Sequence, residues 1–173
     1  MRWMAIGICG LLLGGCAAAS KGPKVVQEAT EGQESALLGQ VKQLEGTWTG
    51  KDAGGDTQTI VFAVSSNGSI VREIMLPGTD HEMTNIYHMD GPDLVMTHYC
   101  AMGNQPRLRA GSAKPGEITL ACDSVTNMTG PGQMYMGGLT LVMKDKNHLI
   151  EKWTSITSGK PDHHASFELT RTK

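Results

Sequence analysis

The feature that most constrains the fold is a series of ten short segments in which apolar residues tend to occupy alternate positions. Clusters of Gly, Pro, Asn and Asp separate these segments. Period-two alternation is typical of half-buried strands, and the intervening residues are typical of turns. No helical pattern interrupts the series, which excludes a parallel sheet built from strand–helix–strand units. The first strand is expected around Trp48, and the others at about 60–64, 70–76, 82–89, 93–101, 106–110, 117–123, 135–143, 148–157 and 164–171.

Consecutive antiparallel strands leave two exposed sheet edges unless the sheet closes on itself. We therefore expect an all-β domain over residues 34–173, an antiparallel meander closed into an eight- to ten-stranded barrel. A single short helix precedes the strands, because Leu37, Val41 and Leu44 are spaced at i, i+4 and i+7. This helix is expected to begin near Glu34 and to end near Gly46.

The charge balance excludes one class of partner. The chain has 15 Lys and Arg against 17 Asp and Glu, so it lacks the positive field that draws a protein to nucleic acid. With 39% hydrophobic residues, the chain has the apolar content of a folded domain rather than of a disordered one.

The amino-terminal segment is predicted to direct export. Arg2 precedes a short apolar stretch at residues 6–13, which has the length of a secretory signal and is too short to span a membrane. The following Leu-Leu-Gly-Gly-Cys, ending at Cys16, resembles the lipobox of bacterial lipoproteins. This resemblance implies a signal peptide over residues 1–15, acyl chains such as palmitate on Cys16, and anchoring without a spanning helix. By the same resemblance, Ala17 after the cysteine favours, in a Gram-negative source, the outer membrane, facing the periplasm. Residues 16–33 are small, polar and charged, and are expected to form a flexible tether.

A second resemblance concerns the barrel. Gly46-Thr47-Trp48 at the first strand, after a short helix and with Arg171 in the last strand, is similar to the calycin superfamily of lipocalins and fatty-acid-binding proteins. It implies that Trp48 lies across a closed barrel end with Arg171 stacked on it, and that the helix caps this end. The strings Tyr-His-Met-Asp at 87–90, Thr-His-Tyr-Cys at 97–100 and Asn-Gln-Pro-Arg at 104–107 resemble the uncharacterised lipocalin-like exported proteins of bacteria.

Alternation along the expected strands predicts which residues face a ligand pocket inside the barrel. One face carries Leu94, Met96, His98, Cys100 and Met102, and the next hairpin contributes Leu120 and Cys122. Cys100 and Cys122 can form a disulfide only if the register brings their Cα atoms within about 7 Å, and the turn between the two strands leaves that register open.

Two arginines share a face of the strand at 106–110. Arg107 and Arg109 either hold a ligand carboxylate inside the barrel or lie in solvent.

Metal and haem binding are alternatives for the same interior residues. Met96, His98, Cys100 and Met102 together would suit Cu(I), although Met is also a common filler of cores and a buried His is commonly satisfied by hydrogen bonds. The ten-stranded nitrobindin-like calycins bind haem through a histidine, for which His98 or His164 is the candidate here. We predict neither a metal nor another cofactor.

Binding of a small hydrophobic molecule is the leading hypothesis for function. The many methionines predict either a pliable apolar cavity or a solid core in which Met replaces scarce Phe. We expect no catalysis, because the sequence has no His-Glu-x-x-His, Gly-x-Ser-x-Gly or P-loop motif. The alternative is a non-catalytic structural or interaction protein of the cell envelope with a filled barrel. No protein partner can be predicted.

Overall fold

The computed structural model describes residues 22–52 and 54–173. The predicted signal peptide at residues 1–15, the lipidation site Cys16 and the start of the tether lie outside these described residues. Within the described part of the chain, no helix has both the length and the apolar character needed to cross a membrane.

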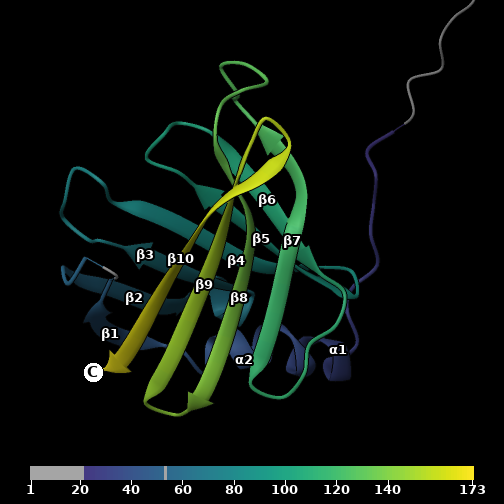
Figure 1. Cartoon of the computed structure of the whole chain (residues 1–173). Helices are drawn as coiled ribbons and strands as arrows, with labels where there is room; N and C mark the ends of the chain where they lie inside the picture. The colour runs from purple at the N-terminus through teal and green to yellow at the C-terminus, as the bar shows by residue number, and fades with distance from the viewer. Residues whose placement is uncertain (1–21, 53) are drawn as a thin grey trace, which may run out of the picture.

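Ten antiparallel strands form a closed barrel (Figure 1) in the order β1-β10-β9-β8-β7-β6-β5-β4-β3-β2. Every strand therefore pairs with its neighbours in sequence, and β1 closes the barrel by pairing with β10. This is the predicted all-β meander. The strands are β1 (Gly46–Lys51), β2 (Thr57–Ser65), β3 (Ile70–Met75), β4 (Met83–Asp90), β5 (Asp93–Tyr99), β6 (Gln105–Ala110), β7 (Glu117–Thr126), β8 (Tyr135–Asp145), β9 (His148–Thr157) and β10 (Lys160–Arg171).

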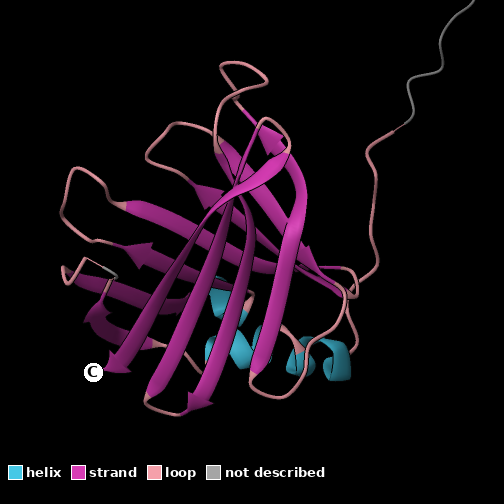
Figure 2. Cartoon of the chain, in the orientation of Figure 1, coloured by secondary structure: helices cyan, strands magenta, loops and turns pink. Residues whose placement is uncertain are grey.

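Two short helices, rather than the single predicted helix, lie together at one end of the barrel (Figure 2). They are α1 (Glu31–Ala36) and α2 (Leu38–Lys42), and non-helical backbone angles at Leu37 (φ −119°, ψ −84°) separate them. A capping box between Thr30 and Gln33 starts α1. The ordered domain thus begins inside the segment predicted to be a tether.

The helices plug the barrel end with apolar side chains. Leu37, Leu38, Val41 and Leu44 are all buried in the main core cluster, in agreement with the spacing that predicted a helix. Residues just before α1 also approach the barrel, since a Cβ on Gly91 would lie 2.7 Å from Val26 Cγ1.

Strand β3 carries a glutamate on the face that it turns toward the core. Val71, Glu73 and Met75 are buried, whereas Ile70 and Ile74 are half-buried on the outer face. The apolar pattern alone does not identify the inward face, because both faces of β3 carry aliphatic residues and the inward position in the middle of the strand is a glutamate. The inward carboxyl of Glu73 becomes central to the site described next.

Candidate functional site

The closed end of the barrel is held by the predicted pair Trp48 and Arg171. The Arg171 guanidinium carbon lies 4.2 Å from the centroid of the buried Trp48 ring, a favourable cation–π geometry. Arg171 also donates to the carbonyls of Gln43 (2.7 Å) and Lys146 (2.8 Å), and to that of Glu45. One side chain therefore ties β10 to the segment after α2 and to the β8–β9 turn.

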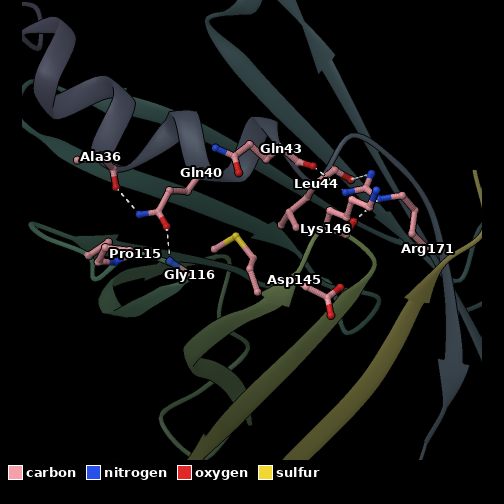
Figure 3. Close-up of a pocket in the computed structure, with 11 residues that line it drawn as sticks. Ala36, Gln40, Gln43, Leu44, Pro115, Gly116, Asp145, Lys146 and Arg171 are labelled. Carbon is pink, nitrogen blue, oxygen red and sulfur yellow. Dashed lines mark hydrogen bonds between the residues drawn. The ribbon is translucent and has the colours of Figure 1, made fainter.

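A groove of about 540 Å³ lies beside this pair, between the helices and the turns after β6 and β8 (Figure 3). Gln40 bridges it by donating to the Ala36 carbonyl (2.6 Å) and accepting from the Gly116 amide (2.8 Å). In the described residues, every buried side-chain polar atom lacking a hydrogen-bond partner belongs to a residue outside this groove. The described lining of the groove therefore contains no buried polar atom that needs a hydrogen bond from a ligand.

The interior of the barrel does contain buried polar atoms without hydrogen-bond partners. Glu73, Asn85 and His98 are directly cross-strand neighbours on β3, β4 and β5, so their side chains project from the same inner face. All three are at most 1% exposed. His98 Nδ1 lies 2.6 Å from Asn85 Oδ1, a contact that places a hydrogen on Nδ1 and leaves Nε2 with a lone pair.

A second buried carboxyl, that of Glu151, comes from strand β9 and also lies inside the barrel. Glu151 Oε2 accepts a hydrogen bond from Trp153 Nε1 (3.1 Å), and the Trp153 ring centroid lies 5.2 Å from that of His98. From β4, the Tyr87 hydroxyl donates to Glu73 Oε2 at 2.5 Å. Six side chains thus form one polar cluster inside the barrel, which we call the inner cluster: Glu73, Asn85, Tyr87, His98, Glu151 and Trp153.

Three atoms of the inner cluster have no hydrogen-bond partner. They are Glu73 Oε1, Glu151 Oε1 and His98 Nε2, and all are buried. A buried polar atom without a partner costs about 1–3 kcal/mol. The described residues that carry the other two such atoms are Asn104 and Arg107, so the inner cluster holds most of the unmet hydrogen-bonding capacity.

Burial also shifts the ionisation of these groups. Loss of solvation raises the pKa of Glu73 to about 7. Burial raises the pKa of Glu151 well above its usual value, and the negative charge of Glu73 adds to this effect. Burial lowers the pKa of His98 to about 4, so its imidazole is neutral at physiological pH. The Tyr87 pKa is raised by burial and by the neighbouring carboxyls, which keeps this hydroxyl a hydrogen-bond donor.

A small apolar notch lies at the barrel end opposite the helices. It has a volume of about 30 Å³, and Met75, Met83 and Phe167 are among the residues that line it. Met75 Sδ lies 3.6 Å from Asn85 Nδ2, so a flexible side chain stands between the notch and the cluster. Phe167 is the direct cross-strand neighbour of Glu151.

The structure divides the residues predicted to line a pocket. Met96, His98 and Leu120 are buried in the barrel, at 0%, 1% and 1% exposure. Cys100 is only half-buried, and Met102 is 48% exposed. Strand β5 ends at Tyr99, before the turn that carries Met102, so the four residues considered as an alternative Cu(I) site are not brought together.

The two cysteines do not form the disulfide that the sequence left open, and both thiols are free. Cys122 is paired with Leu108 on β6, and Leu108 is paired with Met96 on β5. Cys122 therefore lies level with Met96 and two strands away, a separation of about 9–10 Å across the sheet. Cys100 is four residues further along, so the pair is too distant to bridge.

Arg107 and Arg109 lie outside the barrel and do not line an interior pocket. Leu108 between them is buried, and the two arginines form an ion cluster with Asp90, Asp93 and Asp123. Arg109 contacts Asp90 (2.7 Å) and Asp93 (2.9 Å), and Arg107 also contacts Asp90 (2.7 Å). Of the two alternatives for these arginines, the outer face is the observed one.

The haem alternative has a poor fit to these residues. His164 is exposed and its Nδ1 lies 3.0 Å from Thr154 Oγ1. His98 is inside, but Trp153 packs on it and the adjoining notch measures about 30 Å³, whereas cofactor sites typically span about 300–1,000 Å³. Among the described residues, no three His, Cys, Asp or Glu side chains are grouped so that they could hold a metal ion.

Sequence reasoning identified His98 but missed the rest of the inner cluster. A usable signal existed, because Leu149-x-Glu151-x-Trp153 and Val71-x-Glu73-x-Met75 each place a glutamate at an inward position of an apolar strand. A charged residue in that position is rarely buried unless it has a partner or a role.

Comparison with known proteins finds a solved structure with a similar fold but does not assign the chain to a family. No protein-family model and no curated protein sequence matches the chain. The crystal structure of Rv2717c from M. tuberculosis is similar, with a TM-score of 0.52 and 16% sequence identity over 79% of this chain and 97% of that one. The fold is a closed, ten-stranded antiparallel β-barrel. At this level of identity the likeness extends to the fold alone.

Proposed function

We propose that this protein is a non-catalytic, lipid-anchored lipoprotein of the cell envelope, related to the lipocalins, whose barrel binds a small molecule. The ligand's polar group would meet the inner cluster, and its apolar part would lie at the notch between Met75, Met83 and Phe167. The observation that carries this proposal is the set of three buried atoms without partners, on Glu73, His98 and Glu151. Water or a ligand is the usual partner of such atoms in folded proteins.

Methionine supports the adaptation that binding requires. The notch of about 30 Å³ is too small for a drug-sized molecule, so a ligand has to displace side chains. Met75 and Met83 are unbranched and flexible, which allows them to move at low cost. The binding site therefore opens by rearrangement at the end opposite the helices.

The test is a survey of what the full chain carries. We would purify the lipidated protein in mild detergent and identify co-purifying small molecules by mass spectrometry. Glu151→Gln should reduce the recovered ligand severalfold, because it replaces one carboxyl oxygen of the inner cluster with an amide NH₂ group. Glu168→Gln makes the same chemical change at an exposed position of β10 and should leave recovery unchanged. Absence of any small molecule, together with no binding of added apolar compounds, would overturn the proposal.

A filled barrel with an interaction role is the second candidate. Its support is the packing of the interior, where Met96, Leu108, Leu120 and Leu139 are at most 1% exposed. This function predicts protein cross-links at the outer face and no ligand in the same survey.

The anchor is tested separately, at Cys16. The proposal predicts that radioactive palmitate labels the protein and that Cys16→Ser abolishes the label and releases the protein from the membrane fraction. Serine keeps a similar size but lacks the thiol that is acylated. Equal labelling of both proteins would contradict a lipid anchor at this residue.

A further inference from the structure

The inner cluster holds two carboxyls and no basic side chain. Among the described residues, no Lys or Arg forms an ion pair with Glu73 or Glu151, although both are fully buried. The outer ion cluster of the same barrel shows the opposite arrangement, with Arg107 and Arg109 set among three aspartates. Buried carboxylates are normally paired with a cation or held neutral by a proton.

The hydrogen bonds inside the cluster leave only acceptors open when the carboxyls are ionised. The Oε2 atom of Glu73 is used by Tyr87, and the Oε2 atom of Glu151 is used by Trp153. The Oε1 atom of each remains without a partner, as does Nε2 of His98, whose other nitrogen contacts the Asn85 amide oxygen. A matching ligand group therefore brings several donors and no acceptor.

Aromatic side chains complete the surroundings. The indole of Trp153 contacts both His98 and Glu151, and Tyr87 borders Glu73. Aromatic faces attract cations, and the attraction increases when water is excluded. A coordinated metal ion is a poorer match, because no three His, Cys, Asp or Glu side chains among the described residues are placed so that they could hold one, and an ammonium group reaches its acceptors over longer distances of about 2.7–2.9 Å.

We propose that the ligand carries a protonated primary amine, bound in the inner cluster between Glu73, Glu151 and His98. This inference rests on the proposed binding function and specifies its ligand class. An ammonium group supplies three N–H donors and one positive charge, which match three open acceptors and an uncompensated pair of carboxyls. The alkyl part of the amine passes Met75 and Phe167 toward the barrel mouth.

Proton exchange accompanies this binding. Without a ligand, burial keeps the inner carboxyls protonated up to higher pH than usual, and the groups that face them are Tyr87 and His98. An ammonium group stabilises the ionised carboxylates and displaces their protons into solvent. Amine binding should therefore release protons near neutral pH, which a neutral ligand would not do.

The experiment compares three probes of equal length on the full chain at pH 7: n-pentylamine hydrochloride, pentan-1-ol and sodium pentanoate. Isothermal titration calorimetry in phosphate and in HEPES buffer, neither of which contains a primary amine, gives both affinity and proton release. We expect the amine to bind at least about tenfold more tightly than the alcohol, because charge-assisted bonds replace neutral ones. We expect pentanoate to bind most weakly and only the amine to release protons.

Variants locate the site. Glu73→Gln and Glu151→Gln should each weaken amine binding about tenfold or more and reduce its proton release, whereas Glu168→Gln should change neither. An affinity for the alcohol equal to or above that for the amine would overturn the amine assignment while leaving barrel binding intact. Failure of all three probes would also overturn it, and the survey of co-purifying molecules then decides the binding function separately. The probe series uses the unaltered chain, so it decides the matter even if a variant does not fold.

Discussion

At the scale of single residues, the inner cluster should give the protein an unusual dependence of stability on pH. Glu73 has a pKa of about 7 in the folded chain against 4.5 without burial. On raising the pH, the unfolded chain loses this proton first, so ionisation favours unfolding. Between pH 4.5 and 7 the free energy of unfolding should fall by about 3 kcal/mol from Glu73. Glu151 acts in the same direction.

His98 acts in the opposite direction over part of this window. Its pKa is about 4 in the folded chain and 6.5 without burial. Its contribution to stability is therefore present above pH 6.5 and is lost as the pH falls toward 4. It offsets the effect of one carboxyl between pH 4.5 and 6.5.

The first prediction follows from these opposite effects of the carboxyls and of His98 on stability. Urea unfolding from pH 5 to 8 should show the free energy of unfolding decreasing with pH. Glu73→Gln should flatten the decrease, and His98→Gln should steepen it below pH 6.5. The exposed Glu168→Gln should keep the slope of the unaltered chain, and an equal slope in Glu73→Gln would show that Glu73 ionises normally.

The second prediction concerns Arg171 at the closed end. Arg171→Ala removes the stacking on Trp48 and leaves the carbonyls of Gln43, Glu45 and Lys146 without their donor. We expect the free energy of unfolding to fall by about 2–3 kcal/mol. Chemical denaturation measures this loss. Arg72→Ala, at an exposed position of β3, should change stability by less than about 0.5 kcal/mol, and equal losses in both variants would refute a special role for Arg171.

The residues that sequence reasoning found and missed differ in a physical way. Trp48, Arg171 and His98 stand out because few residues of these kinds occur in the chain and their positions relative to strand ends are informative. Glu73 and Glu151 were missed because a charged residue is normally read as facing solvent.

At the scale of elements, the seam between β1 and β10 depends on one glycine. A Cβ on Gly50 would lie 2.0 Å from the Glu168 carbonyl oxygen, so a side chain cannot fit without moving β10. Gly50 is paired with Leu169 in a seam of only four register pairs. The close approach of two backbones therefore requires glycine here.

The third prediction tests this seam. Gly50→Ala should lower the free energy of unfolding by about 3 kcal/mol or more, and hydrogen exchange should increase first in β1 and β10. Gly130→Ala is the matched control, because a Cβ there meets nothing within 4 Å. Unchanged stability of Gly50→Ala would mean that the seam tolerates a wider strand separation.

Element types were predictable, whereas register was not. Period-two alternation gave ten strands near the observed positions, and helical spacing located the segment that caps the barrel. The break at Leu37 and the end of β5 at Tyr99 depend on tertiary packing, which local pattern does not encode. The pairing of Cys122 with Leu108 likewise follows from a bulge between β6 and β7.

At the scale of the whole molecule, the fourth prediction concerns the thiols. The mass of the purified protein should not change on reduction, and both Cys100 and Cys122 should react with iodoacetamide after unfolding. The reason is their separation across two strands of the barrel. Double replacement by serine should leave the fold intact. A mass lower by two hydrogens before reduction would show that the register differs from the one described.

The closure of the barrel also sets the order of events in its biogenesis. Trp48 belongs to the first strand and Arg171 to the last, so the ribosome has made all ten strands before the contact that seals the wall can form. Such distant partners slow folding. A nascent chain of this kind stays unfolded until its synthesis is nearly complete, which fits the export that we propose, because a translocation channel accepts an unfolded polypeptide.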